Sequence, residues 1–278
     1  MTTPPGSSVS PAIELFDSHC HLNYDYAPKT EADLIREAME AGVSTLVTIG
    51  VDLDTIVPVQ AISERYSNVF HTVGVHPHEA ITVQPGDLDR IRQAAKHPKC
   101  RAIGEIGLDY HYDHSPRDVQ RRVLEEQLEL ALELGQPVII HSRDAEPELL
   151  ESLTAYAHKH ARKAETGQSP GVIHCFSGSH EFGKSCLDLG FLISFSGILT
   201  FKSAESLRTS AKEFPLDRLL IETDSPYLAP IPFRGRKCEP SMVKLTALKI
   251  AELKGIQLEE VARVTTATAK RFFRIESA

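Results

Sequence analysis

The segment LEEQLELALELGQPVIIH (residues 124–141) decides the fold class of this chain. Leucine and alanine recur in its first half at helical spacing, and Gly135 followed by Pro137 ends the helix. Three apolar β-branched residues then precede His141, which is typical of a strand that is buried on both faces. A helix that passes directly into a buried strand predicts a parallel sheet covered by helices.

The same alternation of strand and helix patterns recurs along the chain. Eight apolar runs, each expected to form a strand, span residues 13–22, 44–50, 69–75, 100–107, 137–141, 171–176, 191–199 and 219–224. Besides the helix after Pro116, helical patterns cover residues 31–41, 53–66, 88–97, 145–160, 204–214 and 243–253. Because a parallel sheet closes at eight strand–helix units, we predict a single α/β domain, a (β/α)₈ TIM barrel, over residues 13–275. An open doubly wound sheet is the alternative.

Composition limits the partners and the location of the protein. Lys and Arg number 30 against 38 Asp and Glu, a net charge of −8, so a nucleic-acid partner would have to be held by local contacts. The five cysteines are widely spread without a CxxC pair, which favours a reducing cytoplasm over a disulfide framework. The sequence shows no signal-peptide pattern and no membrane span. Residues 1–12 are rich in Pro, Ser and Thr and predict a disordered tail.

Side chains that commonly bind metal ions stand near the ends of five expected strands. They are His19, His21, Glu105, His141, His174 and Asp224. Two residues apart in a strand, His19 and His21 can both face the barrel interior while Cys20 points away. A single HxH pair is weak evidence, and each histidine could be a core residue. All six at strand ends predict a metal site at the mouth of the barrel.

The two carboxylates define the chemistry that we expect. Glu105 interrupts an apolar strand, where an unpaired charge would cost several kcal/mol, so it is expected to bind or bridge metal ions. A buried ion pair with Arg or Lys is the alternative. Asp224 could bind an ion and accept the proton of an attacking water, which makes it the candidate general base. Its alternative role is to cap the turn that follows.

Six segments of the chain resemble one known family, the TatD-type metal-dependent deoxyribonucleases. They are FDSHCHLN (16–23), GVHPHE (74–79), AIGEIGLDY (102–110), PVIIHSRDA (137–145), HCFSGS (174–179) and ETDSPYLAP (222–230). The resemblance covers nearly all of the chain after the tail. It implies an amidohydrolase-like barrel that hydrolyses phosphodiester bonds, typically as a 3′–5′ exonuclease on DNA, with removal of D-amino acids from tRNA in some members.

The resemblance also implies a ligand set for two divalent ions. One ion would be held by His19 and His21 and the other by His141 and His174, with Glu105 bridging them and Asp224 completing the set. Nitrogen and oxygen ligands without thiolates suit Mn²⁺, Mg²⁺ or Zn²⁺, so the metal is left open.

Several loop residues are expected to contact the substrate or to depart from the family pattern. The expected phosphate donors, each of which could instead be solvated, are His76, Arg143, Arg234, Arg236 and Lys237. Cys238 stands where the family's RGKxNEP segment has Asn, and the contact of that Asn is therefore in doubt. His111 and His114, in the loop after the fourth strand, are expected to be solvent-exposed.

These observations predict a metal-dependent nuclease that acts on a DNA 3′ end. The principal rival is a phosphotriesterase or amidohydrolase, which usually carries a carbamylated lysine on strand four, whereas residues 102–110 contain no lysine. D-aminoacyl-tRNA deacylation and a non-catalytic barrel also stay open. The sequence leaves the physiological substrate and the oligomeric state open, with a monomer as one option.

Overall fold

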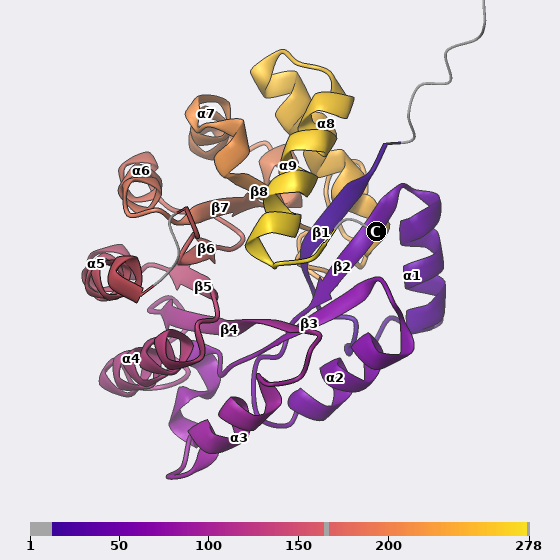
Figure 1. The fold of residues 1–278 in the computed structure, drawn as a ribbon. Coiled ribbons are helices and arrows are strands. Elements are labelled where there is room, and N and C mark those ends of the chain that lie inside the picture. Colours follow the sequence, from indigo (N-terminus) through magenta and orange to yellow (C-terminus); the bar gives the residue numbers. More distant parts are fainter. Residues whose placement is uncertain (1–12, 164–166, 277–278) are drawn as a thin grey trace, which may run out of the picture.

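The computed structural model describes residues 13–163 and 167–276, so the expected N-terminal tail lies outside the described residues. Eight parallel strands form one sheet in sequence order. They are β1 (Leu15–Cys20), β2 (Val43–Thr48), β3 (Val69–Val73), β4 (Cys100–Asp109), β5 (Val138–Arg143), β6 (Gly171–Ile173), β7 (Leu192–Phe195) and β8 (Leu219–Ile221). A parallel bridge between Cys20 and Ser225 joins the two ends of the sheet, which confirms the (β/α)₈ barrel (Figure 1).

Helices surround the barrel (Figure 1). They are α1 (Glu31–Glu40), α2 (Ile56–Arg65), α3 (Asp87–Ala94), α4 (Arg117–Leu134), α5 (Glu146–Lys163), α6 (His180–Asp188), α7 (Glu205–Glu213), α8 (Val243–Lys254) and α9 (Leu258–Phe272). Gly135 follows α4 with a left-handed backbone (φ 64°), which confirms the predicted helix end. Among the described residues, none of the helices has the length and apolar composition that crossing a bilayer requires.

The structure differs from the sequence predictions in several elements. Neither α6 nor α9 belongs to the predicted helical stretches, although both carry apolar residues at helical spacing on the buried face, such as Phe182 and Cys186 in α6 and Val261 and Phe272 in α9. The expected strand over residues 191–199 ends at Phe195, and a 3₁₀ helix occupies Gly197–Thr200. Strand β4 is longer than predicted and continues to Asp109, which proves important for the site.

The amino-terminal half of the barrel interior is apolar. One residue from each strand enters this cluster, and the end of α9 packs against it; the residues are Phe16, Val47, Phe70, Ala102, Ile139, Val172, Leu192, Leu220, Phe272 and Phe273. We call this set the amino-end plug. Phe273 is fully buried and its ring stacks on that of Phe16, with centroids 5.6 Å apart. The plug closes one end of the barrel and leaves the other end for polar side chains.

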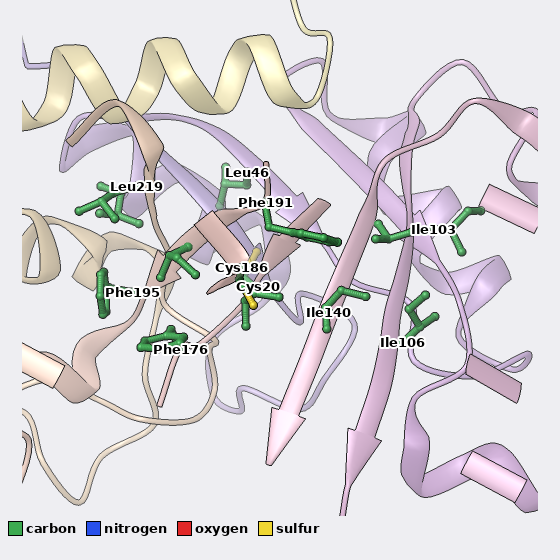
Figure 2. Close-up of a cluster of buried hydrophobic side chains, with 14 of the residues drawn as sticks. Cys20, Leu46, Ile103, Ile106, Ile140, Phe176, Cys186, Phe191, Phe195 and Leu219 are labelled. Carbon is green, nitrogen blue, oxygen red and sulfur yellow. The ribbon is translucent and has the colours of Figure 1, made fainter. Parts of the chain in front are cut away.

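A larger apolar cluster fills the space between the strands and the surrounding helices. Figure 2 shows part of it, with Ile103, Ile106 and Ile140 on the neighbouring strands β4 and β5. Cys20 belongs to this outer cluster, so its side chain points away from the barrel interior as predicted.

Candidate metal centre

Glu105 lies at the centre of the polar end of the barrel. Its side chain is only 4% exposed. Oε1 lies 2.7 Å from His174 Nε2, 3.0 Å from His141 Nδ1 and 3.5 Å from His76 Nε2. Oε2 lies 3.5 Å from His19 Nε2. One buried carboxylate therefore faces four imidazoles from four different parts of the barrel, and no Arg or Lys takes their place among its described ion-pair contacts.

Strand closure brings Asp224 to the same place. Its backbone N–H donates to the carbonyl of His19 at 2.9 Å, beside the bridge that joins β1 to the segment after β8. Its Oδ1 lies 3.5 Å from His21 Nε2 and 3.7 Å from His19 Nε2. The ring of His19 stacks on that of His174, with centroids 3.9 Å apart. All six predicted ligand residues thus share one network.

The close approach of β4 and β5 depends on a glycine. Gly107 has a positive φ of 151°, and a Cβ there would lie 2.1 Å from the carbonyl oxygen of His141. Only a residue without a side chain allows this contact. Gly107 therefore lets Glu105 on β4 and His141 on β5 meet.

In the part of the chain that the structure describes, three sets of residues could each hold a metal ion, because the ligand atoms within each set lie within 4.8 Å of one another. They are His19, His21 and Glu105; His76, Glu105 and His141; and His19, His174 and Glu222. The first set is the HxH pair with its carboxylate. The second contains His76, which the sequence suggested as a phosphate donor. The geometry groups His76 with the candidate ligands, and the division of ligands between two ions stays a prediction.

Sequence reasoning missed three residues of this network, Asp109, His78 and Glu222. Asp109 Oδ2 lies 3.0 Å from His141 Nε2 and 2.9 Å from His78 Nε2, so one buried carboxylate joins two imidazoles. Glu222 Oε1 lies 3.3 Å from His174 Nδ1. Asp109 is four residues after Glu105 and Glu222 two residues before Asp224. Within the expected strands, alternation places such residues on the same side and could have found both carboxylates, although β8 itself ends at Ile221, before Glu222.

Burial and charge act against each other in the pKa values of the site. Burial disfavours the ionised form of Glu105, but the imidazoles around it, His174 foremost, hold its pKa well below the usual range. Burial alone would lower the pKa of His174, and the carboxylates of Glu105 and Glu222 raise it well above its usual value. His19 has a lowered pKa because it is buried beside His174. One buried network therefore contains a carboxylate with a lowered pKa, an imidazole with a raised pKa and an imidazole with a lowered pKa.

The donor set fits divalent cations. Both ring nitrogens of His19 and Nδ1 of His21 are buried and make no hydrogen bond with any residue that the structure describes. A buried polar atom without a partner costs about 1–3 kcal/mol. A cation held between these nitrogens and the carboxylate of Glu105 would remove that cost, and imidazole with carboxylate suits Mn²⁺ and Zn²⁺ in particular.

Comparisons with known proteins agree with this geometry. A family model described as TatD related DNase matches residues 16–274. The chain belongs to the TatD related DNase family. It is 43% identical to the uncharacterized metal-dependent hydrolase YabD of Bacillus subtilis over 94% of this chain and 99% of that protein. It is thus a member of a family of metal-dependent hydrolases.

Two further TatD relatives bear on fold and activity. The crystal structure of YjjV, a TatD homologue from Escherichia coli, superposes with a TM-score of 0.86 at 28% identity, covering 95% of this chain and 100% of that one. A Citrobacter koseri protein named 3′-5′ ssDNA/RNA exonuclease TatD is 33% identical over 94% of this chain and 99% of its own length.

Among the remaining predicted substrate residues of this TatD-family protein, Arg143 ends β5 and the others lie on the loop after β8. Arg143, Arg234, Arg236 and Lys237 are all exposed. The guanidinium of Arg234 lies over the ring of Phe201, 3.8 Å from its centroid. Lys237 Nζ donates to the carbonyl of Asp25 at 2.6 Å. Arg143 and Arg236 are free of ion-pair contacts among the described residues, so both can turn toward a bound anion.

Two departures from the TatD pattern have different surroundings. Cys238 is fully buried, and its thiol faces the carbonyl of Thr223 at 3.9 Å, one residue before Asp224. A thiol can supply the donor half of an Asn side chain and has no amide oxygen. His111 and His114 are exposed, as predicted. His114 stacks on His78, with ring centroids 4.4 Å apart.

Proposed function

We propose that this protein is a divalent-metal-dependent phosphodiesterase that removes nucleotides from the 3′ end of single-stranded DNA. The observation that carries the proposal is Glu105, a buried carboxylate that faces four imidazoles at the end of a barrel where the rival enzyme class has a lysine. The name of the Citrobacter koseri relative supports nucleic acid as the substrate. We propose the cytoplasm as the location, on the basis of the cysteine content.

Different residues of the chain would bind the metal ions, orient the substrate and accept a proton in such a reaction. Divalent ions bound here would supply Lewis acidity toward the phosphate and would favour deprotonation of a water at neutral pH. His19, His21, Glu105 and His141, with His76 or His174, would hold them. The protein groups orient the substrate, exclude bulk water and accept the proton.

Asp224 suits the role of general base. Its side chain is 14% exposed, against 4% for Glu105, so a water can reach it. Burial would raise its pKa, but contact with His21 and the charges of His19 and His174 lower it, so the carboxylate is ionised at neutral pH. An ionised carboxylate at the edge of the centre can accept the proton of the attacking water.

The overall negative charge of the chain limits how nucleic acid can bind. With a net charge of −8, the protein repels a long polyanion. The exposed side chains of Arg143, Arg234, Arg236 and Lys237 can still contact a few phosphates. This favours the capture of a strand end over the coating of a duplex.

The deciding experiment is a panel of substrates and metals. Protein stripped with a chelator is reloaded with Mn²⁺, Mg²⁺ or Zn²⁺ and given 3′-labelled single-stranded DNA, RNA, a phosphotriester and a D-aminoacyl-tRNA. We expect metal-dependent release of 3′-terminal mononucleotides, abolished by Asp224→Asn and retained by the control Asp113→Asn on an exposed loop. Turnover of the phosphotriester or the aminoacyl-tRNA alone would overturn the proposal.

A further inference from the structure

Two exposed tyrosines stand beside the candidate centre. Tyr227 is 53% and Tyr112 is 52% exposed, and they are the aromatic members of the exposed large apolar side chains among the described residues. Tyr112 lies on the loop after β4 and Tyr227 on the loop after β8. A single exposed ring is common on a protein surface, so what distinguishes these two rings is their position beside the candidate centre. Asp109 ends β4 immediately before the loop of Tyr112, and Asp224 lies on the loop of Tyr227, which suggests a common role.

Tyr227 is held next to Asp224, the candidate general base. Its backbone N–H donates to the carbonyl of Asp224 at 2.9 Å. Its ring packs edge-on against His21 and Tyr24, with centroids 6.2 Å apart in both cases. Tyr24 itself stacks on His21 at 4.8 Å. The ring of Tyr227 therefore packs against His21, a candidate metal ligand, while about half of the Tyr227 side chain stays exposed.

Tyr112 is held in a corresponding way on the other side. Its backbone N–H donates to Asp109 Oδ1 at 3.0 Å. Its ring packs edge-on against His78, with centroids 5.5 Å apart. The ring centroid of His78 in turn lies 6.4 Å from that of His141. The guanidinium of Arg143 lies 5.3 Å from the ring centroid of Tyr112. A planar cation and an aromatic ring thus stand together next to a second candidate ligand.

The barrel places the two loops that carry these rings across from each other. The strands are ordered from β1 to β8 and the ring closes between β8 and β1, so the loops after β4 and β8 are half a turn apart. Glu105 and its imidazoles lie between them. A chain that crosses the mouth of the barrel would pass one tyrosine, then the candidate centre, then the other tyrosine.

We propose that Tyr112 and Tyr227 form a tyrosine clamp that stacks the two nucleobases flanking the scissile phosphate, so that the substrate must be a single strand with at least two unpaired bases. This inference rests on the proposed function and adds the residues that recognise the substrate. Stacking explains why the rings are exposed but fixed, because a tyrosine held in place loses little conformational entropy on binding. It also tolerates any base sequence, since every base has an aromatic face.

The test measures the coupling between each tyrosine and each base. Single-stranded oligonucleotides carry an abasic site at the 3′-terminal or at the penultimate position, and kcat/KM is measured for the native protein, Tyr112→Ala and Tyr227→Ala. Removing one stacked base is expected to lower kcat/KM of the native protein between about fivefold and about a hundredfold. In the alanine variant of the matching tyrosine, the same abasic site is expected to cause no further loss.

Control variants separate stacking from general damage. Phenylalanine keeps the ring, so Tyr112→Phe and Tyr227→Phe should retain the native response to abasic sites. Leu248→Ala removes a comparably exposed side chain from α8 on the outside of the barrel and should leave kcat/KM unchanged. Independent losses for base and tyrosine, or abasic substrates that are cleaved as well as intact ones, would overturn the inference.

A binding measurement distinguishes this inference from the proposed function. An oligonucleotide with 2-aminopurine at either of the last two positions is titrated with chelator-treated protein, and fluorescence quenching reports stacking without turnover. Quenching that each tyrosine variant removes at one position supports the tyrosine clamp even if the protein hydrolyses another ester, which would contradict the proposed function alone. Hydrolysis of DNA without tyrosine-dependent quenching or coupling would contradict the tyrosine clamp alone.

Discussion

The two halves of the barrel interior are built from the same eight strands but have opposite chemistry. At the amino end every strand contributes an apolar side chain to the plug, and Phe272 and Phe273 seal it. At the carboxyl end, several of the same strands, or the loops after them, carry histidines and carboxylates. These side chains contact one another, but some of their buried nitrogen atoms have no hydrogen-bond partner among the described residues. The amino end stabilises the fold, and the carboxyl end carries buried polar groups that can bind a ligand. The difference teaches that stability and function can be changed separately in this fold.

The largest effect is expected from the centre of the polar end. Glu105→Gln keeps the shape of the side chain but removes the charge that four imidazoles face, so kcat/KM for DNA should fall about a thousandfold or more. Bound metal, measured by elemental mass spectrometry, should fall with it. The matched control is Glu37→Gln on α1, which should keep both. Native metal content and activity in Glu105→Gln would contradict the assignment of this residue.

A comparable effect, on stability instead of activity, is expected from the plug. Phe273→Ala removes a fully buried ring stacked on Phe16 and should lower the free energy of unfolding by about 3–5 kcal/mol. Urea unfolding of chelator-treated protein measures this loss, and Phe273→Leu should lose less. The folded fraction of Phe273→Ala should keep its kcat/KM within about twofold, since distant sites act independently. A large change in kcat/KM would show that the two halves are coupled.

A smaller effect is expected from Asp109, which joins His141 and His78. The carboxylate orients the ring of His141 through the nitrogen that does not face Glu105, so Asp109→Asn should weaken metal binding by about 10–100-fold. Titration with Mn²⁺ or Zn²⁺ measures the affinity. Asp113→Asn, a change in the loop just after β4 at a residue paired with Arg117, should leave the affinity unchanged. Equal affinities for the two variants would remove Asp109 from the centre.

The smallest effect concerns a buried histidine outside the site. His71 on β3 is fully buried, and its Nδ1 lies 2.8 Å from Ser63 Oγ. No carboxylate is among its described partners, and burial, with help from His97 and Lys99, lowers its pKa to about 3. His174, which is also buried, has a raised pKa because it faces carboxylates. The same side chain therefore shifts in opposite directions in the two settings.

This difference predicts how stability depends on pH. Between pH 6.5 and about 3 the unfolded chain binds a proton at position 71 that the folded chain excludes, so the contribution of His71 to stability falls as the pH falls. The maximum slope for one proton is about 1.4 kcal/mol per pH unit. Urea unfolding of chelator-treated protein from pH 7.5 to 5 should give a shallower slope for His71→Gln than for the native chain. Identical slopes would show that His71 takes up a proton in the folded state.

Much of the fold was predictable because its signals are local. Helix spacing and apolar runs depend on neighbours within a few residues, and the transition from α4 through Gly135 to β5 appears in the structure as predicted. The helix α9 was missed although Val261, Thr265 and Phe272 recur at helical spacing on its buried face. That spacing is a local signal of the same kind, so α9 was predictable from the sequence as well.

The sequence by itself determined which side chains stand at the strand ends, and therefore the kind of chemistry available at the mouth of the barrel. Only the tertiary structure decided which atoms meet. It placed His76 beside Glu105, extended the network to Asp109 and Glu222, and packed the ring of Tyr227 against His21 and that of Tyr112 against His78. The physical reason is that these contacts join residues far apart in the chain. Their distances are fixed by the closure of β1 on the segment after β8, which no local pattern encodes.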